Sequence, residues 1–313
     1  MRISVLVASA ILMSLSSATC LAQASRTKLP AQQFQITDCS TTVQANVEGA
    51  TYTVMNELSF GPNDCIDVTA SGITINLNGN ELRGGCSCSG ISVSKSAIGV
   101  HILGPGTIGG VLDYAIHDMG NLAVIESLTT TAQSFSGIFL DTVQGSIVKE
   151  VTVGGSLGTN DGTSGGIQLT DTNHCVVERS MANGNGLPFT CAAGEPCIGS
   201  STTGIFVGNS GSQNLSIDNL IVGNQANYNV TEGISVGGTG NVVTGNTAAQ
   251  NNNGDILPPV GVGIGVGGPG SNLVIDNTAF KNQTEDLYDG NPHCGTDHWA
   301  VNTFTTSNQT CIH

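Results

Sequence analysis

A four-residue pattern recurs along the chain at nearly regular intervals. Each copy starts with Gly and Ile, has one variable position, and ends with an apolar residue; the first glycines are Gly137, Gly166, Gly204, Gly233 and Gly263. These glycines are 29, 38, 29 and 30 residues apart. A second short apolar line follows each copy after a turn, and a third, looser line carries Gly184, Asn224, Asn251 and Asn282. Each unit therefore reads as two or three short strands with no helical period.

Short strands that repeat at this period cannot bury their apolar faces alone, so successive units must stack into a solenoid. Stacking places one residue type in columns, and we expect Asn219, Asn246 and Asn277 to form one such column, an asparagine ladder. A β-sandwich is the alternative, and it would require hairpin turns every ~8 to 12 residues. The observed period favours stacking.

Composition excludes several classes of protein. The 313 residues include 43 Gly, only 10% are charged and 39% are hydrophobic, which disfavours both disorder and long helices. With 23 acidic and 8 basic residues, the formal net charge of −15 disfavours nucleic acid and anionic membrane surfaces as partners. Cations and sugars remain compatible with this charge.

The first 24 residues have the features of a signal peptide. Arg2 precedes the apolar run of residues 3–15, and Ala22-Gln23-Ala24 fits a cleavage site, so we expect cleavage after Ala24 and a secreted or periplasmic protein. No later stretch is long and apolar enough to span a bilayer. We expect residues 25–313 to form one domain, with irregular turns over 39–136, regular repeats over 137–284 and a C-terminal cap over 285–313.

Nine cysteines follow the predicted cleavage site, and an oxidising compartment favours disulfides among them. The best candidates for pairing are Cys191 with Cys197, which bracket a loop, and Cys294 with Cys311, which bracket the C-terminal end. An N-terminal group contains Cys39, Cys65, Cys86 and Cys88, with the pairing inside it left open. Cys175 lies in an apolar run and is predicted to be a buried free thiol.

The N-terminal half repeats the strand pattern at Gly72-Ile73-Thr74-Ile75, Gly90-Ile91-Ser92-Val93 and Gly99-Val100-His101-Ile102. Together with residues 49–54 and 73–79 and the Asn- and Cys-containing end at 289–312, this resembles the exported bacterial right-handed parallel β-helix proteins of the pectate-lyase-like fold. The resemblance covers residues 39–312 and implies an all-β, single-stranded right-handed parallel β-helix with an asparagine ladder and disulfide-stabilised ends. It is specific for fold rather than activity, because this fold carries many functions.

The resemblance implies that a lyase of this fold would need a basic residue, and a hydrolase two facing carboxylates. Lys149 and Arg179 are central in the repeats, but the column alignment places Lys149 beside Glu178 and Arg179 beside Glu150, which predicts ion pairs. The paired-Asp, Gly-His-Gly and Arg-x-Lys motifs of polygalacturonase-like hydrolases are missing. Whether the protein is an enzyme stays open at this point.

Insertions recur at one corner of the repeats, and such an edge often forms a binding face. Each of the five insertions holds a carboxylate and three hold an aromatic residue, a combination that suits a sugar chain. The substrate-binding candidates are Asp161, Phe189, Glu195, Tyr228, Glu232, Asp255, Asp286 and Tyr288. Solvated loop tips are the alternative interpretation of the same residues.

Metal binding is a weaker expectation. His117 with Asp113 and Asp118 could form a metal cluster, but no periodicity fixes their relative directions and a structural role is the favoured interpretation, so we assign no metal ligands. No cofactor is expected, although the edge carboxylates would suit calcium. The leading hypothesis is an exported protein that binds a polysaccharide along this acidic, aromatic loop edge. The alternatives are a polysaccharide lyase or glycoside hydrolase, and a structural or adhesive surface protein. The sequence leaves the oligomeric state open.

Overall fold

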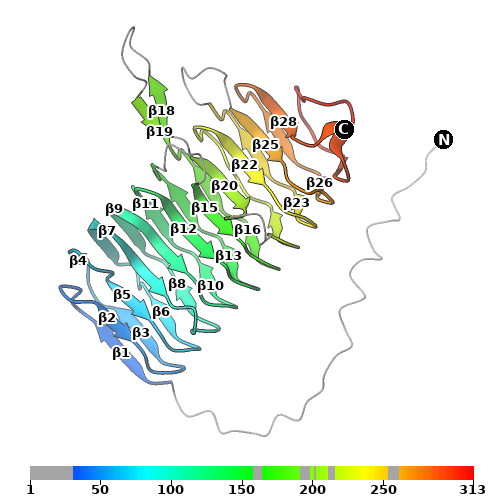
Figure 1. Cartoon of the computed structure of the whole chain (residues 1–313). Coiled ribbons are helices and arrows are strands. Elements are labelled where there is room, and N and C mark those ends of the chain that lie inside the picture. The colour runs from blue at the N-terminus through cyan, green and yellow to red at the C-terminus, as the bar shows by residue number, and fades with distance from the viewer. Residues whose placement is uncertain (1–30, 158–163, 191–197, 201, 211–215, 253–260) are drawn as a thin grey trace, which may run out of the picture. The chain divides into compact units, whose positions relative to one another are not determined.

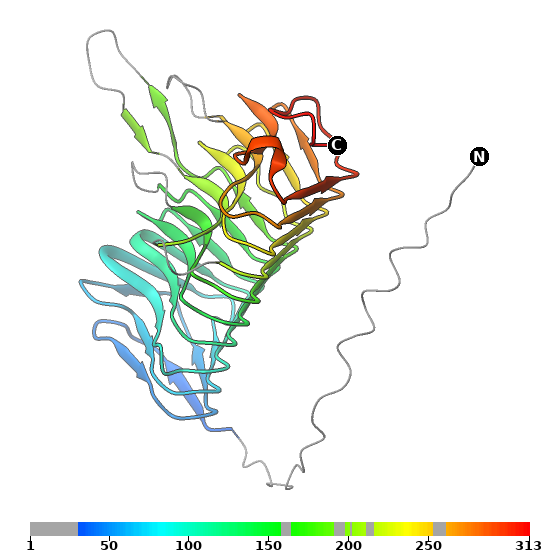
Figure 2. The same cartoon turned by 45° about the vertical axis from the view of Figure 1, so that its right-hand side comes forward.

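The computed structural model describes residues 31–157, 164–190, 198–200, 202–210, 216–252 and 261–313. The predicted signal peptide lies outside these residues and stays a prediction. Residues 32–313 form one compact unit, a right-handed parallel β-helix whose turns stack from β1 to the C-terminus (Figures 1 and 2). The predicted fold class is thereby confirmed.

Each turn of the coil contributes strands to three faces. The first face contains β2 (Val43–Ala45), β5 (Ile66–Val68), the C-terminal halves of β7 (Glu81–Val93) and β9 (Thr107–Asp118), β12 (Ser136–Asp141), β15 (Gly165–Thr170), β20 (Thr203–Gly208), β22 (Glu232–Val236), β25 (Val262–Val266) and β28 (Glu285–Asp289). The third face contains the N-terminal halves of β7 and β9 with β4 (Leu58–Phe60), β11 (Thr129–Thr131), β14 (Thr152–Gly154), β17 (Met181–Asn183), β24 (Thr247–Ala249) and β27 (Thr278–Phe280).

The second face is a separate 11-stranded parallel sheet. Its strands are β1 (Gln33–Ile36), β3 (Thr51–Val54), β6 (Thr74–Asn76), β8 (His101–Leu103), β10 (Val124–Glu126), β13 (Ile147–Lys149), β16 (Val176–Glu178), β21 (Leu220–Val222), β23 (Val242–Thr244), β26 (Leu273–Ile275) and β29 (His298–Ala300). An antiparallel pair, β18 (Leu187–Thr190) and β19 (Ile198–Ser200), projects from the coil (Figure 1). A short 3-10 helix, η1, spans Pro292–Cys294.

The Ile of the repeat fills the interior. Ile138, Ile167, Ile205, Ile234 and Ile264 are aligned by the strand register and are fully buried. Since side chains alternate across a strand, the variable residue after each Ile points outward. The repeat therefore encodes both a core column and a surface column.

Three asparagine ladders run along the coil, one at each corner. One links Asn219, Asn241 and Asn272; one links Asn224, Asn246, Asn277 and Asn302; one links Asn185, Asn229, Asn251 and Asn282. In each step, backbone N–H and Nδ2 donate to Oδ1 of the next asparagine, as Asn246 does to Asn277 at 3.0 Å for both bonds.

The ladder was predicted correctly as a feature but not in its membership. Asn219 does not share a column with Asn246 and Asn277, because Asn219 precedes β21 whereas Asn224 follows it. The two positions lie at opposite ends of the same strand and so belong to different corners.

From Gly166 on, the Gly that opens each repeat is required by the third ladder. A Cβ at Gly204 would lie 2.5 Å from Nδ2 of Asn229, and one at Gly233 would lie 2.7 Å from Nδ2 of Asn251. These distances are too short for any side chain, so the repeat keeps Gly where the ladder passes.

Disulfides lie toward both ends of the described coil. Cys39 pairs with Cys65, Cys86 with Cys88, and Cys294 with Cys311, which confirms the predicted C-terminal bond. Cys175 is free and buried, as expected. Cys191 and Cys197 lie outside the described residues, so their pairing stays a prediction. No helix in the described part of the chain is long and apolar enough to cross a membrane.

Candidate functional site

One column of outward-facing residues crosses the whole first face, perpendicular to its strands. We call it the first-face column. Strand register places its members side by side, one per turn: Gln44, Asp67, Ser92, His117, Phe139, Gln168, Phe206, Ser235, Gly265 and Tyr288. Neighbouring members are about 4.8 Å apart along the coil axis, since that is the strand spacing of a β-sheet.

Four rings gather in the middle of this column. The His117 ring stacks on Phe139 with centroids 5.0 Å apart and an interplanar angle of 7°. Tyr114 lies beside both rings, with centroids 5.0 Å from His117 and 5.2 Å from Phe139, and Phe135 packs against Tyr114 at 5.9 Å. All four rings are partly exposed, so they offer a surface as well as packing against one another.

Electrostatics around these rings are set by burial and by carboxylates. Burial lowers the pKa of His117, against the opposing effects of Asp141 and Asp64. Burial also raises the pKa of Tyr114, with added contributions from Asp113 and Asp141. Nε2 of His117 is inaccessible to solvent, lies 3.6 Å from Oδ2 of Asp141, and has no hydrogen-bond partner among the described residues. Burial therefore favours the neutral form of the His117 imidazole, and the neighbouring Asp141 carboxylate opposes this effect.

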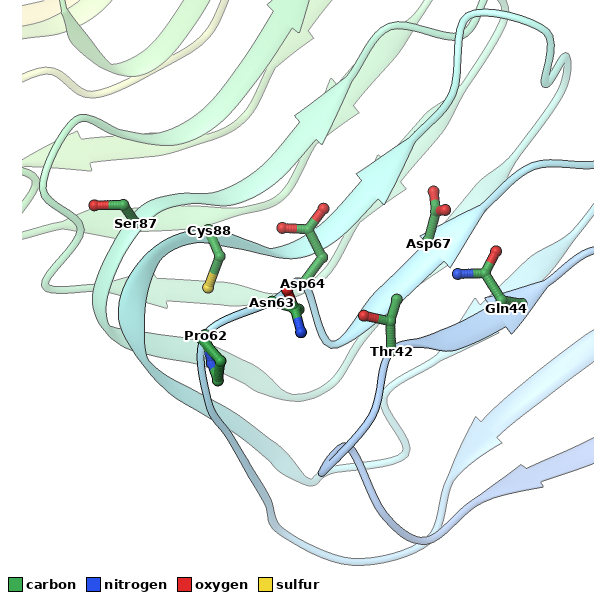
Figure 3. A pocket seen from close by; sticks show the side chains of 8 residues that line it. All are labelled: Thr42, Gln44, Pro62, Asn63, Asp64, Asp67, Ser87 and Cys88. Atoms are coloured by element: carbon green, nitrogen blue, oxygen red, sulfur yellow. The ribbon is translucent and has the colours of Figure 1, made fainter.

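At the N-terminal end of the column lies an open cavity of about 370 Å³. It is lined by Thr42, Gln44, Pro62, Asn63, Asp64, Asp67, Ser87 and Cys88. Figure 3 shows Gln44 and Asp67 side by side on neighbouring strands, and Asp64 between Asp67 and Cys88. Oδ1 of Asp64 accepts a hydrogen bond from the Ser89 backbone at 2.7 Å, which fixes one of the two carboxylates.

Beyond the rings the column becomes alternately polar and aromatic. Oε1 of Gln168 accepts a hydrogen bond from the Ser136 hydroxyl at 2.6 Å, and its Nε2 donates to Thr170 Oγ1 at 3.2 Å. Ring atoms of Phe206 occupy the space that a Cβ of Gly208 would fill, so the ring lies along the strand. The Glu232 carboxylate lies over Gly265, where a Cβ at Gly265 would be 2.9 Å from Oε1 of Glu232. Burial raises the pKa of Glu232.

The structure places the predicted binding residues in different surroundings. Glu232 and Tyr288 lie on strands of the first face, and Tyr288 is 39% exposed. Tyr228 is 61% exposed at the corner before β22, outside the first-face column. Asp161, Glu195, Asp255 and the side chain of Phe189 lie outside the described residues, so their roles stay predictions.

The prediction that Asp286 binds substrate is not supported, because its side chain is buried. Its Oδ1 accepts from Nδ2 of Asn282 at 3.0 Å, and its Oδ2 accepts from the backbone of Thr305 at 2.9 Å and of Thr306 at 3.2 Å. Asp286 thus ends the third ladder and is not available to a ligand.

Basic residues on the second face are held by carboxylates. Nζ of Lys149 lies 2.5 Å from Glu126, which also binds Nε2 of His101 at 2.6 Å. The predicted partner, Glu178, is level with Lys149 in register but binds Arg179 at 2.8 Å instead. The expected pair of Arg179 with Glu150 is present at 3.2 Å. This pairing argues against a lyase whose base is Lys149 or Arg179.

The candidate metal cluster of His117, Asp113 and Asp118 does not form. Asp118 follows His117 directly, so its side chain points into the interior, where it is fully buried and accepts hydrogen bonds from the Gly120 backbone at 2.9 Å and the Ser146 hydroxyl at 3.3 Å. Within the described ranges, no three His, Cys, Asp or Glu residues are placed to share a metal ion.

Sequence reasoning missed the first-face column although its signal was present. The variable position of each Gly-Ile repeat is Phe139, Gln168, Phe206, Ser235 or Gly265 in turn. His117 occupies the same position in Ala115-Ile116-His117-Asp118, where Ala replaces the repeat's Gly and hides the match. Alignment of these variable positions would have identified the column.

Comparison with known proteins supports the fold. No family model and no curated protein sequence matches the chain. The structure is similar to an alginate lyase from Paenibacillus sp. str. FPU-7, with a TM-score of 0.68, 14% identity, and coverage of 90% of this chain and 99% of the lyase. It is also similar to the A-module of the mannuronan C-5 epimerase AlgE6 of Azotobacter vinelandii, with a TM-score of 0.60, 12% identity, and coverage of 84% and 72%.

A third similar structure is the Agl-KA catalytic domain, with a TM-score of 0.58 and 14% identity over 84% of this chain and 50% of that one. At these identities the similarity establishes the β-helix fold, and the function has to be argued from the site.

Proposed function

We propose that this protein is an exported polysaccharide-binding protein that holds a glycan chain along the first-face column. The observation that carries the proposal is the continuous outward column, in which the stacked His117 and Phe139 rings are followed by Gln168 and Phe206. Rings pack against the apolar faces of sugars, and amides and hydroxyls between them satisfy sugar hydroxyls. A straight column with one position per turn matches a repeating linear ligand.

The structural neighbours support the same class of ligand, because an alginate lyase and a mannuronan epimerase are proteins that act on polysaccharides. Export is supported by the signal-peptide features of residues 1–24. The proposal moves the binding surface from the predicted loop edge to the strands of the first face, with Tyr288 and Glu232 shared between the two surfaces.

The test is affinity electrophoresis of the mature protein in gels that contain neutral, acidic or amino polysaccharides. In the gel that retards the wild type, Phe206→Ala should weaken binding about tenfold, since a ring contact is worth about 1.5 kcal/mol. Phe280→Ala is the control, because Phe280 is an exposed phenylalanine that lies on the third face. Equal effects of the two variants, or full binding by Phe206→Ala, would overturn the proposed surface.

Tyr228→Ala separates the column from the loop edge. Tyr228 is the most exposed aromatic residue of the described edge and lies off the column. Loss of binding in Tyr228→Ala with normal binding in Phe206→Ala would restore the loop edge as the site.

A second candidate function is cleavage of the bound polysaccharide, favoured by the grouping of His117, Tyr114 and Asp141, three side chains that can exchange protons, on the column. A neutral imidazole beside a carboxylate can accept a proton during catalysis. Release of reducing ends, or ultraviolet absorbance from unsaturated products, would establish cleavage. His117→Gln should then abolish turnover, whereas its effect on binding should be no larger than the roughly tenfold loss expected from removing one ring of the column.

A further inference from the structure

The charges of the first face indicate what kind of glycan it binds, and this inference rests on the proposed function. Every strand segment of the first face lacks Lys and Arg. The five basic residues of the described ranges lie elsewhere: Arg83 pairs with Glu81 at 3.0 Å on the third face, Lys149 and Arg179 are paired on the second, and Lys95 and Lys281 lie on turns between faces.

Carboxylates, in contrast, accompany the column along most of its length. Asp64 and Asp67 line the cavity at its N-terminal end, Asp141 faces His117 in the middle, and Glu232 lies over Gly265 beyond Phe206. No Lys or Arg of the described chain forms an ion pair with any of these four carboxylates. Lys and Arg therefore do not cancel the charges of Asp64, Asp67 and Asp141, whereas burial disfavours the charged form of Glu232.

An acidic polysaccharide on this surface would bring its carboxylates close to Asp64 and Asp67 at the cavity, and close to Asp141 three turns further along the column. Like charges at these distances repel, and nothing on the strands compensates, so the arrangement disfavours a polyuronate. The two alginate-related neighbours act on acidic chains, so this surface would differ from them in ligand rather than in fold.

We propose that the first-face column binds a glycan built from amino sugars, whose ammonium groups face Asp64, Asp67 and Asp141 while the sugar rings pack on Phe139 and Phe206. Cleavage by β-elimination needs a uronic acid, so such a ligand is incompatible with a lyase and compatible with simple binding or hydrolysis. The alternating rings and carboxylates provide both parts of the recognition.

The experiment is isothermal titration of the mature protein with three oligosaccharides of equal length: glucosamine, N-acetylglucosamine and mannuronate oligomers. The first two share one backbone and differ in charge, so their ratio isolates the ammonium contribution. At pH about 6, where carboxylates are ionised, the glucosamine oligomer should bind at least tenfold more tightly than its acetylated form. The mannuronate oligomer should show no measurable binding. The advantage of glucosamine should shrink about threefold or more between ~20 mM and ~500 mM salt.

Variants locate the effect on the face. Asp67→Asn and Asp141→Asn should each reduce glucosamine affinity about threefold and leave N-acetylglucosamine affinity unchanged. Asp276→Asn is the matched control, because Asp276 is an exposed aspartate at the end of β26 on the second face. If Asp276→Asn weakens binding as much as Asp67→Asn, net charge alone explains the preference and the assignment to this face fails.

Two further outcomes separate this inference from the proposed function. Mannuronate binding that is lost in Phe206→Ala would overturn the amino-sugar inference and keep the polysaccharide-binding face. Absence of binding to all three oligomers and to the polysaccharide gels would overturn both.

Discussion

The first and second faces are built from the same turns of one coil but differ in whether their carboxylates are paired with basic side chains. On the second face, Glu126 holds Lys149 and His101, and Arg179 lies between Glu150 and Glu178. On the first face, Asp67 and Asp141 have no Lys or Arg partner within the described residues, and aromatic rings take the neighbouring positions. Basic side chains thus balance the carboxylates of the second face, whereas the carboxylates of the first face, where we place the ligand, have no such partner.

The largest expected effect concerns the carboxylate buried where the first face turns into the second. Burial raises the pKa of Asp118 to about 7 from a usual value of 3.8. The folded protein then binds more protons than the unfolded chain between about pH 4 and pH 7, so the free energy of unfolding falls as pH rises through this range. The total loss should be on the order of 4 kcal/mol.

Asp118→Asn removes this titration, keeps an oxygen for the Gly120 hydrogen bond, and replaces the oxygen near Ser146 with an amide N–H that can donate to the Ser146 hydroxyl. Urea unfolding at pH 5 and pH 8 should show a strong pH dependence in the wild type and a weak one in the variant, with the variant more stable at pH 8. If the free energy of unfolding depends on pH in the same way in the wild type and in Asp118→Asn, the titration of Asp118 is not the cause of that dependence.

An intermediate effect is expected from a lysine introduced on the column. Ser92 lies between Asp67 and His117, so Ser92→Lys would give Asp67 the cationic partner that it lacks. Affinity for a glucosamine oligomer should fall about fivefold, and the discrimination against mannuronate should weaken. Thr244→Lys on the second face is the control and should change neither affinity. A stronger glucosamine interaction in Ser92→Lys would contradict the charge assignment.

The smallest effect is expected on the second face itself. Glu126→Gln removes the shared partner of Lys149 and His101, whose side chains are 31% and 36% exposed. Because partly exposed ion pairs contribute little, the midpoint of thermal unfolding should fall only slightly and glycan affinity should stay the same. A marked loss of glycan binding in this variant would erase the distinction between the two faces.

Much of the fold was predictable because the repeat is a physical requirement. Gly204 and Gly233 leave room for ladder asparagines, and Ile205 and Ile234 fill the core, so spacing alone revealed parallel stacking. Membership of the ladders was not predictable from residue type, since Asn219 and Asn224 flank one short strand and only the register separates their corners.

The candidate site was harder to predict for a similar reason. His117 and Phe139 are 22 residues apart in sequence and stack only because β9 and β12 are aligned. Tertiary burial then decided which acidic residues remain accessible: Asp286 satisfies backbone N–H groups, whereas Asp67 lines a cavity. The sequence shows only that both residues are acidic, and it does not show which carboxylate the fold buries.

The C-terminal end of the coil has a consequence for self-association. A parallel β-helix ends in strands whose backbone groups could pair with another molecule, as in the growth of a fibre. Here the segment after β29 returns over the last turn, where Leu287 bridges to Ser307 and the Cys294–Cys311 bond secures it. We therefore expect the Cys294–Cys311 disulfide to hold this segment in place, and its reduction to leave the last strands accessible to a second molecule. On this account, an oxidising environment would keep each coil separate, and a reducing one would allow strand pairing between the ends of two chains.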